Sequence, residues 1–205
     1  MNTKFSTLAS KESINAAISG LKANGVDAQF VQTGTEAKQK ALDILPKGTE
    51  VMTMTSVTLD TIGLSAEIND SGNYQSIRNK LMGMDWAKQG REMQKIGASP
   101  EWALGSVHAV TEDGKVLIAS NTGSQLGAYA YGSAKVIWVV GAQKIVKDID
   151  EGMKRIYEHS LVLESERAKK AYGVAGSAVN KILVVNKEVQ PGRITMIIVN
   201  EVLGF

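Results

Sequence analysis

Three short polar segments each follow a run of strand-forming residues, and their side chains have the chemistry of an anion-binding site. Thr55–Thr58 brings hydroxyl groups, Asn121–Gln125 brings amides, hydroxyls and a glycine, and Gly141–Lys144 ends in an ammonium group. Ligands of open α/β sheets bind outside the carboxyl ends of the strands, where such segments meet. We therefore expect one cleft for a small anionic molecule, with these ligand-binding residues: Ser56, Thr58, Asn121, Gly123, Ser124, Gln125 and Lys144.

Each segment also has a structural explanation that involves no ligand. Ser56 can cap a helix that begins at the next residue, which commonly contributes about 0.5–2 kcal/mol. Asn121–Gln125 can be a capped strand-to-helix turn, although Gly123 would let a ligand approach the backbone and the helix start would offer N–H groups to an anion. Lys144 can meet a phosphate or carboxylate, or it can be a solvated surface lysine. None of the segments matches a phosphate loop or the Gly-x-Gly-x-x-Gly pattern of dinucleotide sites.

A carboxylate, Glu112, stands at a predicted hairpin turn just before the strand Val116–Ala119. Asp113-Gly114 is a strong turn signal, and a glutamate beside such a turn is often simply exposed. Alternatively, Glu112 lies in the same cleft as the polar segments and acts as a nucleophile or base. The residues leave both explanations open, and Glu112 is our catalytic candidate.

Composition excludes several classes of function. The 205-residue chain has no cysteine and two histidines, His108 and His159, which are far apart in the sequence. It therefore cannot by itself hold a thiolate-bound iron–sulfur cluster or a cysteine zinc site, and we expect no metal site and no cofactor. A net charge of +2 without a dense basic tract argues against nucleic acid as a partner. No stretch resembles a signal peptide or a membrane span, so we expect no membrane partner and a cytoplasmic protein.

Helix and strand patterns alternate along the chain and predict an α/β fold with a mostly parallel central sheet flanked by helices. We assign Val51–Thr55, Val116–Ala119 and Val136–Val140 to this sheet. The last of these is apolar at every position, as in a strand that is buried on both faces. The length fits a single domain, residues 1–205, with a helical excursion at about 66–103.

Two helical segments carry further expectations. In the excursion one helix face gathers apolar side chains, which predicts that this face packs against the core: Met82, Trp86, Met93 and Ile96. A helix over residues 148–172 is unusually long. Part of it could project toward another subunit, so a homo-oligomer is one expectation.

The segment Ser106–Val146 resembles the core of the LUD (lactate utilisation) domain family. That family typically has an Ala-Thr-Glu-x-Gly turn, a strand, a glycine-containing loop, and a strand that ends in Val-Gly-x-x-Lys-Ile-Val; here the turn reads "VTEDG" and the second strand ends in "VGAQKIV". "TSVTLDTIGL", Thr55–Leu64, and "GRITMIIVNEVLGF", Gly192–Phe205, resemble two further family segments in the same order.

The resemblance implies the fold shared by glucosamine-phosphate deaminase, ribose-phosphate isomerase and coenzyme A transferases. It also implies a link to oxidation of lactate to pyruvate, in which LUD proteins accompany iron–sulfur subunits. Family members often carry Gly-Asn or Gly-Asn-Arg where this chain has Gly123-Ser124-Gln125, so a guanidinium that could bind an anion with two hydrogen bonds is missing there.

Three functions follow as hypotheses. The first is an accessory or binding protein for lactate, pyruvate or another small organic acid, without a redox cofactor of its own. The second is an isomerase- or acyl-transfer-type enzyme that acts on a sugar phosphate or coenzyme A ester, with Glu112 as its carboxylate; a glutamate near a glycine is also the nucleophile of the coenzyme A transferases. The third is a structural assembly subunit that makes contact through the helix at 148–172.

Overall fold

The structure is a computed structural model and describes residues 3–205. Its α-helices are α1 (Lys11–Ala23), α2 (Gly34–Ile44), α3 (Val57–Thr61), α4 (Leu64–Asp70), α5 (Ile77–Met82), α6 (Trp86–Ala98), α7 (Ile149–Arg155) and α8 (Leu161–Tyr172). Short 3₁₀ helices are η1 (Thr3–Ser6) and η3 (Ala142–Lys144), and π-helices are η2 (Ala128–Gly132) and η4 (Ile156–Ser160). The strands are β1 (Asp27–Val31), β2 (Glu50–Thr53), β3 (Gln75–Ser76), β4 (Trp102–Gly105), β5 (Ala109–Thr111), β6 (Val116–Ser120), β7 (Lys135–Gly141), β8 (Ile145–Val146), β9 (Lys181–Val185) and β10 (Ile194–Val199).

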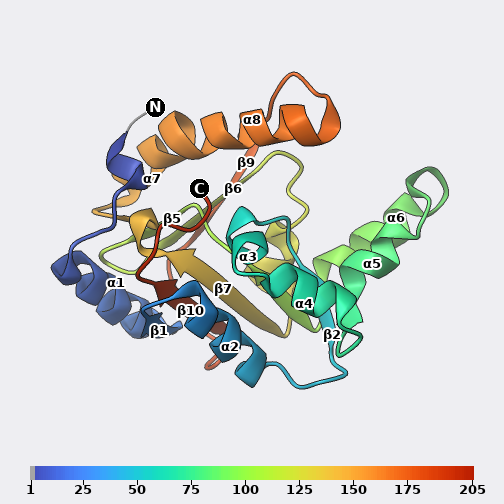
Figure 1. Ribbon diagram of the computed structural model, residues 1–205, viewed down its shortest axis with the longest axis horizontal. Helices are drawn as coiled ribbons and strands as arrows, with labels where there is room; N and C mark the ends of the chain where they lie inside the picture. The colour runs from blue at the N-terminus through green and yellow to red at the C-terminus, as the bar shows by residue number, and fades with distance from the viewer. Residues whose placement is uncertain (1–2) are drawn as a thin grey trace.

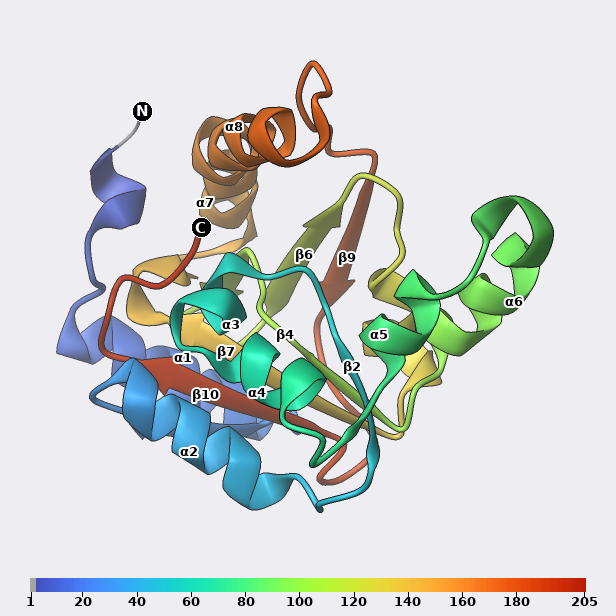
Figure 2. The same ribbon diagram turned by 45° about the vertical axis from the view of Figure 1, so that its right-hand side comes forward.

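The strands form two sheets. The larger sheet has six strands in the order β1-β10-β7-β4-β2-β3, and every neighbouring pair in it is parallel. Helices connect its strands, as a parallel sheet requires, and Figures 1 and 2 show α2 and α4 along one side of it. The α/β fold with a mostly parallel central sheet flanked by helices is therefore confirmed.

The hairpin at Asp113-Gly114 is confirmed, but its second strand does not belong to the central sheet. β6 pairs antiparallel with β5 and with β9, and β8 completes a separate four-stranded sheet in the order β8-β5-β6-β9. The assignment of Val116–Ala119 to the parallel sheet was wrong because an apolar run reports burial and not the pairing partner.

The central strand β7 separates two hydrophobic cores. Val136, Trp138 and Val140 pack with α1 and with the second sheet, whereas Ile137 and Val139 pack with α2, α3 and α4. This alternation confirms that the all-apolar strand is buried on both faces. A third core lies on the other face of the second sheet, under α7 and η4, and includes Leu117 and Ile156. The layers therefore follow in this order: α2, α3 and α4; the parallel sheet; α1 with the second sheet; and α7 to α8. Figures 1 and 2 show α7 and α8 on the side of the molecule away from α2.

Between α4 and β4 the chain runs outward through α5 and α6, which we call the arm (77–98). Figure 1 shows the arm projecting from the body at the right. No residue of α6 is buried, and Trp86 is 62% exposed. The expectation that the Met82 and Trp86 face packs against the core was therefore wrong, because the arm turns this face toward a cavity and solvent instead.

The long helix expected at 148–172 is present as three consecutive pieces, α7, η4 and α8. Asp148 caps its start by accepting the N–H of Glu151 at 2.9 Å. It ends at Gly173, whose φ of 67° is the left-handed conformation common after helices. Arg155, the last residue of α7, and Ser160, the last residue of η4, are hydrogen-bonded to each other, and Arg155 also reaches the His108 carbonyl next to the second sheet.

No helix in residues 3–205 is long and apolar enough to cross a membrane.

Candidate ligand-binding site

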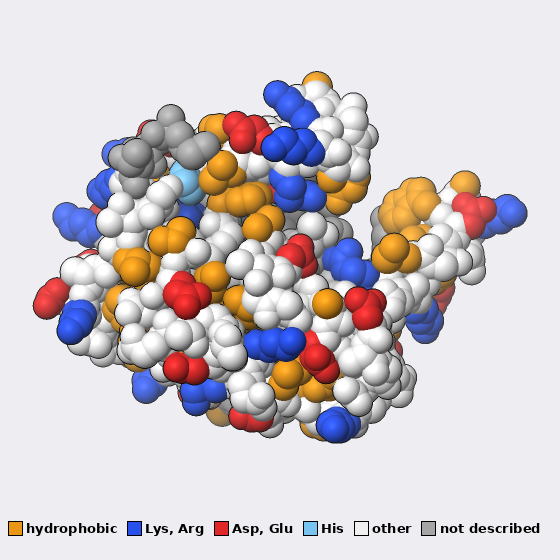
Figure 3. All heavy atoms as spheres, in the orientation of Figure 1, with side chains coloured by type: hydrophobic (Ala, Val, Ile, Leu, Met, Phe, Trp, Pro, Cys, Tyr) orange, Lys and Arg blue, Asp and Glu red, His pale blue; other side chains and the backbone are white. Residues whose placement is uncertain are grey.

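A cavity of about 910 Å³ lies at the carboxyl edge of the large sheet. Segments that follow four strands line it: Ser56 and Thr58 after β2, Ser106 and His108 after β4, Lys144 after β7, and Asn121, Gly123, Ser124 and Gln125 after β6. All seven ligand-binding candidates from the sequence are thus brought together in one cavity. Figure 3 shows its mouth as a hollow between the arm and the far end of α8.

Lys144 forms the deepest cationic group of the cavity and is only 1% exposed. Its Nζ donates to Thr58 Oγ1 and to Ser106 Oγ, each at 3.1 Å. Burial, and then the positive charge of Arg155, holds its pKa well below the usual lysine value. No carboxylate among residues 3–205 forms an ion pair with Lys144. A bound anion would supply a counter-charge and favour the ammonium form of the side chain.

Arg155 is a second buried cation behind the cavity floor. It is 0% exposed, and its Nη1 donates to the carbonyl oxygen of His108 and to Ser160 Oγ. Its Nε and Nη2 have no hydrogen-bond partner among the described residues, and burial lowers its pKa to about 10. Two buried cations without an anion are costly, because desolvation penalises the charge and nothing repays it.

His108 presents a neutral hydrogen-bond donor to the same cavity. Burial, followed by the charges of Lys144 and Arg155, lowers its pKa to about 3, so the ring is neutral at pH 7. Its Nδ1 accepts the N–H of Ala119 at 3.1 Å. A neutral imidazole whose Nδ1 accepts must carry its proton on Nε2, so Nε2–H is the free donor.

Ser56 has the structural role that the sequence predicted. Its Oγ accepts the N–H of Leu59 at 3.3 Å and so caps α3. Thr58, the second residue of α3, donates to the carbonyl oxygen of Leu203 and accepts from Lys144. The cap therefore fixes the helix that holds Thr58 against the ammonium group.

In the loop Asn121–Gln125, the backbone N–H groups of Gly123 and Ser124 already have hydrogen-bond partners within this segment of the chain, although we expected free N–H groups here. The N–H of Gly123 donates to Ser120 Oγ at 2.8 Å, and that of Ser124 donates to Thr122 Oγ1 at 3.3 Å. Gln125 is held in turn by Ser120 and by the Ala119 carbonyl. The loop satisfies its own donors because a hydroxyl residue lies two or three positions before each of them.

Gly123 is required by the shape of this loop. Its φ of 88° lies in the left-handed region, and a Cβ there would lie 2.7 Å from Cδ of Lys181. The side chain of Lys181 thus occupies the space beside the glycine, and its Nζ donates to the Thr122 carbonyl at 2.9 Å. The glycine serves the turn more directly than it serves a ligand.

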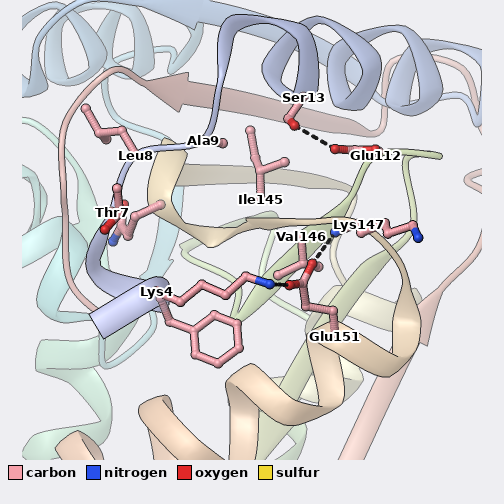
Figure 4. Close-up of a pocket in the computed structure, with 12 residues that line it drawn as sticks. Lys4, Thr7, Leu8, Ala9, Ser13, Glu112, Ile145, Val146, Lys147 and Glu151 are labelled. Atoms are coloured by element: carbon pink, nitrogen blue, oxygen red, sulfur yellow. Dashed lines mark hydrogen bonds and ion pairs between the residues drawn. The ribbon is translucent and has the colours of Figure 1, made fainter. Parts of the chain in front are cut away.

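Glu112 does not share this cavity. It lines a separate pocket of about 390 Å³ together with Ser13, whose hydroxyl donates to Glu112 Oε1 at 2.6 Å. Figure 4 shows this pair on one side of Ile145 and the ion pair of Lys4 with Glu151 on the other. The expectation that Glu112 lies beside the anion-binding loop was wrong, because the β5–β6 hairpin runs between them: Glu112 is at its turn, whereas Asn121–Gln125 follow its far end.

The LUD domain family model matches residues 14–199, which is most of the chain and includes every predicted site residue. The chain belongs to the LUD domain family. Among solved structures, a DUF162 family protein from Deinococcus radiodurans matches with a TM-score of 0.57 at 13% identity, covering 95% of this chain and 100% of that one. A structure of eIF2B beta from Chaetomium thermophilum covers 68% of this chain and 44% of that one, at 14% identity and a TM-score of 0.29. No curated protein sequence matches the chain.

In this LUD domain protein the sequence reasoning missed three residues around Lys144, namely Ser106, His108 and Arg155. The first two follow β4, a strand of only four residues that we did not assign from the sequence. Had Trp102–Gly105 been taken as a strand, the rule that found Ser56 would also have found Ser106 and His108. Arg155 carries no such signal, because it lies within a helix and reaches the site through the fold.

The LUD domain shows no group of three or more His, Cys, Asp or Glu side chains placed to hold a metal ion within residues 3–205. Lys144 at the cavity floor and Arg155 behind it are the two basic side chains buried there.

Proposed function

We propose that this LUD domain protein binds a small organic acid of the lactate or pyruvate type, with the carboxylate of the acid beside Lys144. The observation that carries the proposal is the buried side-chain amine of Lys144 at the floor of the cavity, which has no ion-pair partner among residues 3–205. A bound carboxylate supplies the missing counter-charge, and charge-assisted hydrogen bonds of this kind are stronger than neutral ones.

The groups around Lys144 can also bind the hydroxyl or keto oxygen next to the carboxylate of such an acid. Ser106 lines the cavity and is already within 3.1 Å of Lys144 Nζ. The neutral His108 adds an N–H donor that a hydroxyl or keto oxygen can accept. A carboxylate and a neighbouring oxygen would thus find one cation and neutral partners on the same wall.

The role that we propose for this binding is that of an accessory protein in organic-acid utilisation, as the family suggests. The chain has no cysteine, so thiolate-bound iron–sulfur clusters of a lactate-oxidising system would be carried by partner chains. The alternative of an isomerase or acyl-transfer enzyme with Glu112 as its carboxylate gains nothing from the geometry, because Glu112 lines a different pocket.

Calorimetric titration of the purified chain with lactate, pyruvate and lactamide tests the proposal. Lactamide keeps the size and hydroxyl of lactate but lacks its charge. We expect both acids to bind and lactamide to bind far more weakly, with a thermal shift for each acid that follows its affinity; at 100 times the dissociation constant a ligand adds about 2.7 kcal/mol of stability. Equal binding of lactate and lactamide would exclude a carboxylate site at Lys144.

A further inference from the structure

The cavity continues from its polar floor to a mouth that a three-carbon acid does not fill. Several apolar side chains line this mouth, beside the ion pair of Glu164 with Arg167, whose guanidinium lies 5.3 Å from the centroid of the Tyr172 ring. On one side of the mouth the arm contributes Leu81, Trp86 and Met93, and on the other the end of α8 and the following loop contribute Tyr172 and Val174. Figure 3 shows hydrophobic side chains gathered on both sides of this hollow. A volume of about 910 Å³ is in the range of pockets that enclose much larger ligands than lactate.

Trp86 is arranged as a flat surface at this mouth. A Cβ on Gly90, one turn further along α6, would lie 3.4 Å from Cδ2 and Cε2 of the indole, so the ring lies over the glycine. The side chain is nevertheless 62% exposed, because nothing among the described residues covers its outer face. Tyr172 and Val174 across the mouth are 64% and 46% exposed. Exposed apolar side chains that face one another across a cavity are typical of a ligand site.

Packing within this chain does not explain the apolar face of α6 that carries Trp86. α6 has no buried residue, although its sequence gathers apolar side chains on one face. Since every exposed apolar surface is costly in water, a ligand that covers this face would gain free energy in proportion to the area it buries.

We propose that the ligand of this cavity is an amphipathic organic acid: a carboxylate with a neighbouring oxygen at the Lys144 floor, and an apolar tail that lies against Trp86 and Tyr172 at the mouth. This inference rests on the proposed function, because it places the same carboxylate at Lys144. It adds the substrate class, which is an acid with a long hydrocarbon tail.

A series of 2-hydroxy acids with one head group and increasing tail length tests the inference: lactate, 2-hydroxyhexanoate and 2-hydroxyoctanoate, each titrated by calorimetry. We expect the affinity to rise by about fourfold for each methylene that becomes buried. In Trp86→Ala most of this gain with chain length is lost. Tyr131→Ala is the matched control, since Tyr131 is an aromatic side chain that is 86% exposed outside the cavity, and it keeps the gain of the unmodified protein.

Fluorescence gives a second readout that a change in folding would not imitate. Trp86 is 62% exposed, whereas Trp102 and Trp138 are 9% and 0% exposed, so acrylamide quenching reports on Trp86. We expect 2-hydroxyoctanoate to protect this fluorescence from acrylamide and lactate to leave it quenched.

The outcomes separate the inference from the proposal beneath it. If all three acids bind with the same affinity and Lys144→Met abolishes their binding, the apolar tail site is refuted and the carboxylate site stands. If long acids bind Trp86→Ala as tightly as the unmodified protein, the tail lies elsewhere and the inference falls. If long acids bind Lys144→Met undiminished, the carboxylate site is refuted, and the inference falls with it.

Discussion

Replacing Lys144 by Met should weaken anion binding strongly and leave the fold intact. Methionine keeps most of the length and apolar volume of the lysine stem, so the substitution removes the ammonium group without opening a large cavity. The side chain is 1% exposed, and only Thr58 and Ser106 lose a hydrogen-bond donor. Thr58 keeps its own bond to the Leu203 carbonyl at 3.1 Å, and Ser106 is only partly buried.

Two opposing terms set the effect on stability. The two lost hydrogen bonds are worth about 0.5–1.5 kcal/mol each. Against this, the desolvation of Lys144 and its repulsion from Arg155 both disappear. Replacing buried charges by apolar groups of similar size is often neutral or stabilising by about 1–4 kcal/mol. We therefore expect the free energy of unfolding to stay within about 2 kcal/mol of the original value, and we expect a small increase more than a decrease.

The effect on binding should be much larger, because a bound carboxylate would then be buried without its cation. Removing one partner of a buried charge pair costs about 2–5 kcal/mol, which is roughly a 30-fold to several-thousandfold loss of affinity. Lactate calorimetry and urea unfolding measure the two quantities. Lys135→Met is a matched control. Lys135 is the first residue of β7, at the end of the strand opposite to the end that leads to Lys144, so it lies away from the cavity. A destabilisation well beyond about 2 kcal/mol would refute the stability argument, and undiminished lactate binding would refute the carboxylate site at Lys144.

Three further substitutions separate the parts of the site. His108→Gln should reduce the loss of folding stability at acid pH. The pKa of His108 is about 3 in the folded protein and 6.5 in the unfolded chain, so the unfolded chain takes up the proton first. The original protein therefore loses stability as pH falls from about 6.5 toward 3. Urea unfolding at pH 7 and pH 4 should show a smaller loss of stability in the variant by roughly 2–3 kcal/mol. An equal loss in both proteins would contradict a ring that is neutral in the folded state. Ser124→Asp adds a negative charge to the cavity wall, so lactate should bind more weakly while the melting temperature changes little, because Ser124 is exposed; unchanged affinity would remove this loop from the site. Glu112→Gln should leave lactate affinity unchanged, since Glu112 lines the other pocket, and a large loss in calorimetry would show that the two pockets are coupled.

The sequence by itself determined the local structure and which strand ends carry the polar groups. An all-apolar run marked β7, Asp113-Gly114 marked the hairpin, and Ser56 marked the start of α3. These features depend on side-chain spacing and on hydrogen bonds between near neighbours, which the sequence states directly. Because parallel strands present their carboxyl ends at one edge, this reasoning explains why Ser56, Thr58 and Lys144 share a cavity. Asn121–Gln125 also line it, but they follow β6 of the second sheet, to which the rule does not apply.

Tertiary structure alone decided how deep each group lies and what it faces. Lys144 could be a surface lysine by sequence, yet it is buried by Thr58 and Ser106, which lie 86 and 38 residues away in the chain. Trp86 has the spacing of a core residue, yet it lies on α6, which has no buried residue. Glu112 and Ser124 are close in sequence, yet they line different pockets. Periodicity shows that a helix or strand has an apolar and a polar face. Burial and proximity depend on segments far apart in the chain, which come together only when the two sheets and their helices pack.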